Sequence, residues 1–457
     1  MGTERGRPLI AFFNYSDLFE DFFPYYGVDQ QTFATRWAAT SNHTYLSLLQ
    51  REVGDVVWYV FSLRPQLREA RHEVVGCQIR FLRASVPRRL LRWGMLAGGA
   101  GRRRFGRREE RTTSPAAHPA VADAGDATAR RTGMSRLYRT VGSYLTMLSG
   151  PLLRALLRDR PDFLFVQDYA TGRFDALVLL ARMLGIPLIT IHTGSRPESY
   201  LGAGLKRFTI PRATRIIVSG SEEAGRLVER FGVPRDRVRI IQTPVDLRLF
   251  RPRDRAGACR EAGLDPRRRY LLFVGRLDER PKHVSMLIRA FADISGGHRD
   301  TDLLIAGDGP DGPWLRALAE ELAPGRIRCL GWVGDAEMLA RLYNVAECLV
   351  LCSRHEGFPT VVGEALASGT PVLATRVGGV AEVVRDGVSG WLIPPEDPPA
   401  LVDALSRVLR RPDLVDTMRP QARAMAEARL DPAVAAAALR ECFSRPAAAL
   451  RLTRQSV

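Results

Sequence analysis

Short apolar runs that alternate with helix-patterned stretches are the feature of this sequence that most limits its fold. From Leu271 onward the runs are LLFVG (271–275), LLIAG (303–307), IRCLG (327–331), CLVLC (348–352) and PVLAT (371–375). The stretches between them repeat apolar residues with a period near 3.6, which is typical of amphipathic helices. Apolar strands separated by such helices indicate a parallel sheet that is covered on both faces. This half of the chain is therefore predicted to be a doubly wound α/β domain.

The N-terminal half repeats the same alternation less regularly. Helices are expected over about 30–50, 135–158, 174–184 and 221–231, and strands over 9–14, 56–61, 74–82, 163–168, 187–192, 215–219 and 238–242. We predict two doubly wound domains, 1–245 and 246–425, and a C-terminal helical segment, 426–457, that could pack back on the first domain. Ligands of such folds bind at the carboxyl ends of the strands, so a cleft between the two sheets is expected to hold the site.

Basic residues are concentrated in one part of the first half. Residues 80–111 contain 11 arginines against two glutamates, Glu109 and Glu110, a net charge of +9. Such a patch suits an anionic partner, whether a bilayer, a nucleic acid or an acidic substrate. Within it, RRLLRWGML (88–96) fits an amphipathic membrane contact and a solvated helix equally well. No aromatic-interleaved recognition motif accompanies the arginines, so we expect no nucleic-acid partner.

The segment 97–133 has a different composition from the rest of the chain. It contains one aromatic residue and no Leu or Ile, and it is rich in Ala, Gly and Arg. Such a segment cannot bury enough apolar surface to offset its ordering entropy, so we predict a disordered basic insertion.

Targeting and redox features are sparse. No apolar run approaches the roughly 18 residues of a membrane span, and the N-terminus has no signal-peptide pattern, so a cytoplasmic protein is expected, with peripheral membrane association left open. The six cysteines have neither disulfide-framework nor zinc spacing, which favours reduced structural thiols. Only two residues, Lys206 and Lys282, are lysine.

Two carboxylates lie eight positions apart in HEGFPTVVGEALASGTPVL (355–373). Gly357 and Pro359 cannot continue a helix and Thr360 is a good N-cap, so a helix is predicted over 361–368. Glu356 would then lie in the loop after a strand, and Glu364 about one turn inside the helix. Both could flank helix amides that suit an anion, although Glu364 could instead only complement the helix dipole.

The spacing of Glu356 and Glu364 is that of the E-x7-E signature of retaining glycosyltransferases with the GT-B fold. The surrounding EGFPTVVGEALASGTPVLATRVGGVAEVV resembles glycosyltransferase family 4 almost position by position. FVGRLDERPKH (273–283) is similar to the G-R-L…K segment of the family, and PDFLFVQDYATGRFDALVLLARMLGIPLITIHTG (161–194) resembles a pattern of its first domain. The likeness covers most of 161–425 and implies a GT-B glycosyltransferase.

The resemblance also implies roles for individual residues. Arg276 and Lys282 would grip the donor diphosphate, Glu364 would hydrogen-bond the nucleotide ribose, and Val333 would lie beside the base. Glu356 would bind the donor sugar and His192 would face it, so these two are the candidate catalytic residues. Backbone around Phe358, Pro359, Thr360 and Val361 would hold sugar and phosphate. The Gly-Gly of the family's first strand-to-helix loop corresponds here to Gly27 alone, in FPYYGVDQQTF (23–33).

No metal or other cofactor is expected. The segment DTD (300–302) imitates the metal-binding D-x-D motif of GT-A transferases. It precedes a strand instead of ending one, so it is interpreted as a solvated loop. The diphosphate charge would instead be met by Arg276, Lys282 and helix amides.

The predicted reaction moves a sugar from a nucleoside-diphosphate sugar to a glycolipid, polysaccharide or small-molecule acceptor, with retention of configuration. One alternative is a non-catalytic protein that binds a nucleotide sugar or a membrane surface. Another is a GT-B phosphorylase or a sugar-phosphate synthase. A hydrolase with Glu356 and Glu364 as acid and nucleophile is disfavoured, because each carboxylate has a more specific binding role in the resemblance.

Overall fold

The computed structural model describes residues 6–14, 18–22, 28–35, 40–97, 133–192 and 203–444. The chain divides into two compact units, each built on a mostly parallel sheet. The first contains residues up to Val218, Ala224–Ile240 and the chain from Ala436 onward, and the second contains Ser219–Glu223 and Ile241–Ala435. The predicted α/β class, with two doubly wound sheets, is confirmed. Gly27 and nearly all of the predicted insertion 97–133 lie outside the described residues.

The sheet of the first unit has eight strands in the order β3-β4-β2-β1-β5-β6-β7-β8. All neighbouring strands pair in parallel except β3 and β4. The sheet order reverses between β1 and β5, which is the topological switch point of this unit. The strands are β1 Leu9–Phe13, β2 Asp55–Ser62, β3 Glu69–Arg71, β4 Gln78–Arg83, β5 Phe163–Gln167, β6 Leu188–Ile191, β7 Arg215–Val218 and β8 Val238–Ile240.

The helices of the first unit fill the connections between these strands. They are α1 Phe19–Phe22, α2 Gln30–Thr35, α3 Thr40–Leu48, the π-helix η2 Leu49–Val53, α4 Val86–Ala97, α6 Gly133–Met147, α7 Gly150–Asp159, α8 Gly172–Leu184, α9 Ala203–Thr209, the 3₁₀ turns η4 Ile210–Arg212 and η5 Arg235–Arg237, and α10 Ser221–Phe231. The helix predicted over 135–158 is two helices, because Pro151 starts a new helix after the extended residue Ser149. Of the helix predicted over 30–50, the structure describes α2, α3 and the start of η2, and residues 36–39 lie outside the described residues.

The strand predicted over 74–82 begins only at Gln78. The residues before it form a tight turn in which Gly76 has φ 76° and the N–H of His72 donates to the carbonyl of Cys77. A left-handed residue of this kind reverses the chain, so β3 and β4 form an antiparallel pair instead of one long strand.

The sheet of the second unit has six parallel strands in the order β11-β10-β9-β12-β13-β14. Its order reverses between β9 and β12, which places the switch point of this unit there. The strands are β9 Arg269–Val274, β10 Thr301–Ala306, β11 Ile327–Gly331, β12 Cys348–Leu351, β13 Val372–Thr375 and β14 Gly390–Ile393. The helices are α11 Arg255–Glu261, α12 Glu279–Lys282, α13 Val284–Ser295, α14 Gly312–Leu322, α15 Ala336–Val345, α16 Thr360–Ala367, α17 Val380–Val383, α18 Pro398–Arg410 and α19 Pro412–Leu430.

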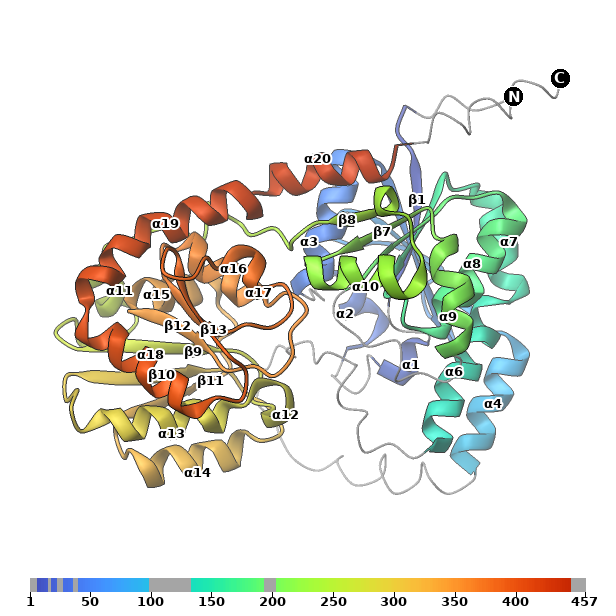
Figure 1. The fold of residues 1–457 in the computed structure, drawn as a ribbon. Helices are drawn as coiled ribbons and strands as arrows, with labels where there is room; N and C mark the ends of the chain where they lie inside the picture. The colour runs from blue at the N-terminus through green and yellow to red at the C-terminus, as the bar shows by residue number, and fades with distance from the viewer. Residues whose placement is uncertain are drawn as a thin grey trace. The chain divides into compact units, whose positions relative to one another are not determined.

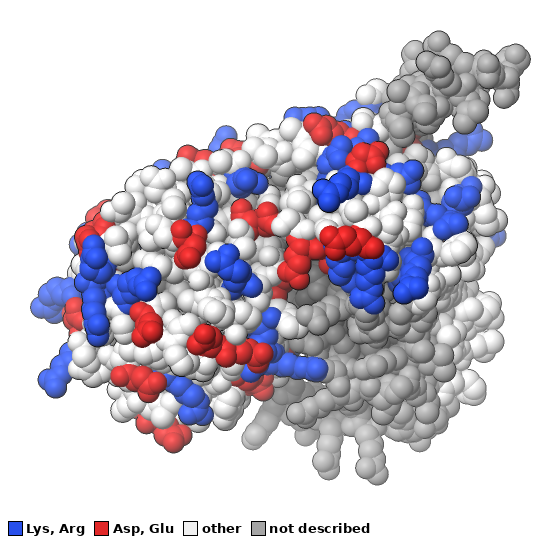
Figure 2. Space-filling model, in the orientation of Figure 1, with Lys and Arg blue, Asp and Glu red and all other residues white. Residues whose placement is uncertain are grey.

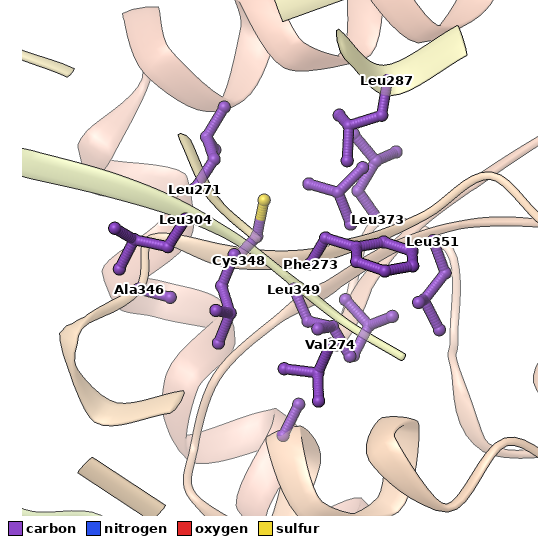
Figure 3. Packing of buried hydrophobic residues seen from close by; sticks show 14 of the residues in the cluster. Leu271, Phe273, Val274, Leu287, Leu304, Ala346, Cys348, Leu349, Leu351 and Leu373 are labelled. Carbon is purple, nitrogen blue, oxygen red and sulfur yellow. The ribbon is translucent and has the colours of Figure 1, made fainter. Parts of the chain in front are cut away.

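Helices cover both faces of this second sheet, with α13 and α14 on one side and α15 and α16 on the other (Figure 1). The strands are therefore buried on both faces, which explains their continuous apolar sequences. Figure 3 shows side chains of neighbouring strands interleaved in this core, among them Phe273 of β9 and Leu349 of β12, with Leu287 of α13 approaching from one side. Leu272 of β9 pairs with Leu304 of β10 and with Leu349 of β12, which fixes the register around the switch point.

The last described helix, α20 Pro432–Cys442, leads the chain into the first unit. Just after it, the ring of Phe443 packs edge-on against Phe163 and Phe165 of β5, with centroid distances of 5.4 and 5.5 Å. The end of the described chain is thus held in the core of the first unit.

The DTD segment differs from its prediction as a solvated loop. Thr301 begins β10, and Asp302 is buried within that strand. Two arginines neutralise this carboxylate: Arg268 donates to both of its oxygens, and Arg326 Nε lies 3.1 Å from Oδ1. Asp302 is therefore part of a buried ion-pair network within the second unit.

The structure also describes the cysteines and the length and polarity of the helices. All six cysteines are free thiols. Burial raises the pKa of Cys77 to about 12 and that of Cys442 to about 11, so these thiols are poor nucleophiles. Across the described ranges, no helix combines the length and the apolar character needed to cross a bilayer.

Candidate functional site

The candidate site lies at the carboxyl edge of the second sheet, beside its switch point. Arg276 and Lys282 follow β9, Glu356 follows β12, and these two strands are neighbours. Val333 follows β11 at the same edge. Loops that leave neighbouring parallel strands at one edge form the ligand site of open α/β sheets. The sequence-predicted residues of the second half are thus brought to one edge of one sheet.

The closest contact in this site joins Lys282 and Glu356. Lys282 Nζ lies 2.6 Å from Oε1 of Glu356, and the hydroxyl of Ser353 donates to the same oxygen, also across 2.6 Å. Both acidic and basic side chains keep part of their surface exposed, 10% for Glu356 and 21% for Lys282. The pair is therefore partly desolvated, and each group remains accessible to a ligand.

Ser353 is a residue that the sequence analysis missed. It is buried, it lies two residues after the end of β12, and its carbonyl accepts a hydrogen bond of 2.6 Å from Thr375 at the end of the neighbouring strand β13. These contacts fix Ser353, which in turn orients the carboxylate of Glu356. The signal that could have found it is its place, directly after an apolar run and three residues before Glu356.

The segments that carry Lys282 and Glu356 are also joined through their backbones. The N–H of Arg354 donates to the carbonyl of Pro281 across 2.8 Å, and its guanidinium donates to the carbonyls of Glu279 and Arg280. Arg354 also pairs with Glu396 at 2.7 Å. The short helix α12 is thus held against the loop of Glu356 independently of the Lys282 side chain.

The loop of Glu356 packs against a glycine turn that follows β13. Gly378 has φ 51°, and a Cβ atom there would lie 1.9 Å from the carbonyl oxygen of Glu356. The next residue, Gly379, donates its N–H to the carbonyl of Gly357 across 2.7 Å. Only glycine allows this approach, so the VGG of this segment fixes the position of the Glu356 backbone.

The second carboxylate, Glu364, belongs to α16. The helix begins at Thr360, one residue earlier than predicted, so its N-cap is Pro359 and not Thr360. Proline is tolerated at a helix start, because the N–H group that it lacks would have no intrahelical acceptor there. The first amides of a helix lack intrahelical acceptors, and anion binding by the backbone from Phe358 to Val361 stays a prediction.

Glu364 has a partner that the sequence did not reveal. The hydroxyl of Tyr343, on α15, donates to Oε2 of Glu364 across 2.7 Å. Burial raises the pKa of Glu364, and the hydrogen bond from Tyr343 opposes part of that shift. Burial and the nearby carboxylate raise the pKa of Tyr343 well above its usual value, so the phenol remains the donor. Glu364 is therefore an oriented carboxylate rather than only a complement to the helix dipole.

Arg276 lies near an acidic neighbour of its own. Its Nη2 atom is 3.7 Å from Oδ2 of Asp278, a long and partly exposed ion pair. The residue before it, Gly275, has φ 158° and donates its N–H to the carbonyl of Ala306. The chain therefore turns sharply as it leaves β9, and Arg276 is held at the carboxyl edge.

His192 lies in the first unit, directly after β6. Its Nδ1 atom is 3.1 Å from Oδ1 of Asp168, and its ring stacks on Tyr169 with centroids 4.3 Å apart. The backbone N–H of His192 donates to the carbonyl of Ile217. Asp168 has φ 67° and its side chain also accepts from the N–H of Ala170. The histidine is thus buried and oriented by a carboxylate.

The two lysines have different environments. Lys206 is buried in the first unit, where its Nζ atom donates to Asp175 across 2.9 Å and to the carbonyl of Thr171 across 2.6 Å. Burial lowers its pKa. Tyr144 and Thr209 also donate to Asp175. We therefore interpret this buried network as a structural one. Lys282 is therefore the lysine that is available to a ligand.

Charge on the second unit is largely paired. On the face shown in Figure 2, basic and acidic side chains are interspersed over this unit, with no extended patch of one sign. Within the described ranges, no group of three or more His, Cys, Asp or Glu side chains is close enough to hold a metal ion.

Comparison with known proteins gives two family matches. Residues 53–249 match the family described as Glycosyltransferase Family 4, and residues 268–411 match the family described as Glycosyl transferases group 1. A D-inositol 3-phosphate glycosyltransferase of Frankia alni is 32% identical over 294 residues, which are 59% of this chain and 72% of that protein. One from Nocardia farcinica is 35% identical over 49% of this chain and 54% of that protein, so the alignment spans about half of its length.

Solved structures share the fold. A sucrose-phosphate synthase of Thermosynechococcus elongatus has a TM-score of 0.68 with 20% identity, covering 98% of this chain and all of that one. The Anabaena protein HepE, solved with UDP, has a TM-score of 0.66 with 15% identity, covering 94% of this chain and 98% of that one. The predicted GT-B fold is confirmed by these likenesses.

Proposed function

The chain belongs to glycosyltransferase family 4 and is a glycosyltransferase, and from this premise we propose that its donor is a nucleoside-diphosphate sugar bound at the carboxyl edge of the second sheet. The observation that carries the proposal is the contact of Lys282 and Ser353 with one oxygen of Glu356, beside the switch point of that sheet. It joins a diphosphate-binding cation to a sugar-binding carboxylate. The UDP in the solved HepE structure supports a nucleotide of this class.

The chemistry depends on charge that develops on the leaving group. As the bond from the sugar to the nucleoside diphosphate breaks, negative charge grows on the diphosphate. Arg276, Lys282 and the amides at the start of α16 stabilise that charge. These groups need no metal ion, and we propose that turnover is metal-independent.

The two carboxylates take different parts. Glu356 accepts hydrogen bonds from hydroxyl groups of the donor sugar, and its contact with Lys282 places the sugar next to the diphosphate. Glu364, oriented by Tyr343, accepts from the ribose hydroxyls, and Val333 lies beside the base. The backbone from Phe358 to Val361 holds sugar and phosphate oxygens.

In this proposal the first unit binds the acceptor and contributes His192. The hydrogen bond to Asp168 and the stacking on Tyr169 hold the imidazole in one orientation, which suits contact with the transferred sugar. The acceptor is a sugar, a lipid or a small molecule. D-inositol 3-phosphate is the first acceptor to test, because the similar Frankia protein is named for it.

Proton NMR of the product tests both the reaction and its course. An α-linked nucleotide sugar is incubated with a panel of acceptors in excess EDTA, and an α-linked product is expected. A β-linked product would contradict retention, and activity restored only by magnesium or manganese would contradict the metal-free account. Donor binding without turnover on any acceptor would favour the non-catalytic alternative, and a requirement for free phosphate would favour a phosphorylase.

We also propose that α4 contacts an anionic membrane surface. Val86, Leu90 and Trp93 occupy one face of this helix at i, i+4 and i+7, and they are 56%, 62% and 70% exposed. A hollow of about 440 Å³ lies beside them, with Arg64, Arg83, Arg89 and Arg92 in its wall. Exposed apolar residues flanked by arginine fit the boundary between acyl chains and acidic headgroups.

Vesicle sedimentation tests the membrane contact. Trp93→Glu should reduce sedimentation with vesicles that contain phosphatidylglycerol, because it removes an anchor and adds a repelling charge. Trp314→Glu is the matched control, since Trp314 is an exposed tryptophan of α14 in the second unit. Deletion of 97–133, which lie almost wholly outside the described residues, should also weaken sedimentation. Equal sedimentation of all four proteins would show that α4 is only a solvated helix.

A further inference from the structure

A second cavity lies at the amino edge of the second sheet, opposite the edge that carries Lys282 and Glu356. Its volume is about 780 Å³, within the range of small-molecule sites. Arg269 in its wall is the first residue of β9, Glu347 directly precedes β12, and Ser368 lies between α16 and β13. Residues that precede parallel strands share the amino edge of the sheet. The cavity is therefore separated from the donor site by the length of the strands, about 15–20 Å.

The wall of this cavity is rich in arginine. It contains seven arginines and three acidic residues, and most of the arginines have a carboxylate partner. Arg268 pairs with Asp302, and Arg423 pairs with Glu427. The opposite charges within each pair cancel, so these arginines attract an anionic ligand only weakly.

Arg255 is different from these paired arginines. Its two Nη atoms donate to the carbonyls of Pro266 and Arg268, at 3.0 and 2.6 Å, and no carboxylate of the described ranges lies within 4 Å of its guanidinium. Carbonyl oxygens satisfy its hydrogen bonds but do not cancel its charge. Among the described residues, the positive charge of Arg255 therefore has no ion-pair partner.

Four buried polar atoms of the wall have no hydrogen-bond partner within the described part of the chain. They are Arg253 Nε, Arg255 Nε, Arg269 Nη2 and Ser368 Oγ, and the whole of Ser368 is only 3% exposed. A buried donor without an acceptor is costly, and few are normally found in a folded protein. Their concentration around one cavity indicates that acceptor oxygens of a ligand complete these bonds after a modest rotation of the side chains.

One part of the wall is apolar and rigid. Four prolines, Pro252, Pro266, Pro412 and Pro420, contribute to it, together with Ala424 of α19. Proline rings offer flat apolar surfaces whose ordering costs no side-chain entropy. A ligand of this cavity therefore combines an anionic group with a body that packs against these rings.

We propose that this cavity binds a small organic phosphate monoester, with the phosphate beside Arg255, Arg269 and Ser368 and the organic body against the prolines. A phosphate suits the site better than a carboxylate because it has more acceptor oxygens for these unsatisfied groups. The proposal does not rest on the donor site or on the transfer reaction. Because the two sites lie at opposite edges of the sheet, both ligands are expected to bind at once.

Phenyl phosphate is the probe, because it combines a phosphate with a flat apolar ring. Its binding to the full chain is measured by isothermal titration calorimetry and by saturation-transfer NMR, in the presence and absence of UDP. Binding should be unaffected by UDP and by Lys282→Ala, and it should exceed the binding of benzoate and of inorganic phosphate.

Filling the cavity provides the decisive variant. Ala424 lines the cavity with an exposed side chain, so Ala424→Phe blocks it without removing a core contact. Ala428→Phe is the matched control, since Ala428 is exposed one turn further along α19 and does not line the cavity. Ala424→Phe should weaken phenyl phosphate binding at least tenfold and Ala428→Phe should not. Arg255→Gln should weaken it as well.

Four results would overturn the proposal. The first is the absence of phenyl phosphate binding to the wild-type chain. The second is equal binding by the wild type and Ala424→Phe. The third is displacement of the probe by UDP together with loss of binding in Lys282→Ala, which would assign the probe to the donor site. Tighter binding of benzoate than of phenyl phosphate would contradict the phosphate assignment.

Discussion

Tyr343 donates its hydroxyl proton to Glu364 across 2.7 Å, and this hydrogen bond links two helices, α15 and α16, on the same face of the second sheet. The ring of Tyr343 is fully buried and packs edge-on against Phe250, with centroids 6.0 Å apart. Its position is therefore fixed by the core, and the core in turn fixes the carboxylate of Glu364. A core residue thereby orients a group of the donor site, which makes Tyr343 a positioning residue in the proposed function.

Tyr343→Phe should weaken the binding of nucleoside diphosphates by about 0.5–1.5 kcal/mol, the net value of one hydrogen bond. The ring stays in place while the carboxylate loses its orienting donor, so preference for a ribose over a 2′-deoxyribose should fall. Calorimetry with UDP and dUDP measures both quantities.

Tyr270→Phe is the control for that variant. Tyr270 is also buried in the second unit, and its hydroxyl donates to the carbonyl of Asp265. Its loss should lower stability without changing nucleotide affinity. Equal affinity changes in the two variants would show that Tyr343 acts only through stability.

Glu364→Gln should stabilise the chain at high pH while it weakens donor binding. Burial raises the pKa of Glu364 in the folded chain above the unfolded value, so the unfolded chain releases this proton at lower pH. The contribution of Glu364 to stability therefore falls as the pH rises from the unfolded pKa through the folded pKa. Glutamine does not titrate and can still accept from Tyr343.

Thermal melts at pH 5 and pH 8 test this account of Glu364. The melting temperature of Glu364→Gln should exceed that of the wild type by about 2–4 °C at pH 8, which corresponds to about 1 kcal/mol in a domain of this size. The difference should be smaller at pH 5. A variant that is less stable than the wild type by the same amount at both pH values would contradict the assignment.

Lys282→Ala should weaken nucleoside diphosphate binding by about 1.5–3 kcal/mol, the scale of a hydrogen bond to a charged group. Arg280→Ala is the matched control, because Arg280 is an exposed cation of the same short helix. It should change affinity little. Product inhibition by the diphosphate measures both effects, and unchanged inhibition in Lys282→Ala would remove Lys282 from the donor site.

The strands of the second unit could be predicted because burial on both faces demands continuous apolar sequence. The ends of the expected runs lie within two residues of the ends of the observed strands β9 to β13. Two strands were missed for physical reasons. Glu69–Arg71 is a polar edge strand, and Gly390–Ile393 begins with a glycine that has low strand propensity.

The site could be predicted only as far as local motifs reach. The spacing of Glu356 and Glu364 indicated both carboxylates, because a loop and the first turn of one helix are close in sequence. Tyr343 lies 21 residues before Glu364, on another helix, so their contact exists only after both helices pack on the sheet. Ser353 lies near Glu356, but its role depends on Thr375 of the next strand. Side-chain partners of this kind follow from tertiary packing.

Asp168→Asn should lower the turnover number by about 10- to 100-fold, which corresponds to the loss of a hydrogen bond to a charged group, about 1.5–3 kcal/mol. Asp168 lies at φ 67°, a left-handed conformation that asparagine also adopts readily, so the backbone should not change. An amide can present its N–H₂ group to Nδ1 of His192, which removes the single orientation and tautomer that the carboxylate enforces. The Michaelis constant for the donor should change little, because the donor is bound by the second unit.

Tyr169→Phe is the control for Asp168→Asn. It keeps the ring that stacks on His192, so its turnover number should remain close to that of the wild type. Steady-state kinetics of the three proteins test the role of the histidine, and a turnover number of Asp168→Asn equal to that of the wild type would show that His192 is only structural.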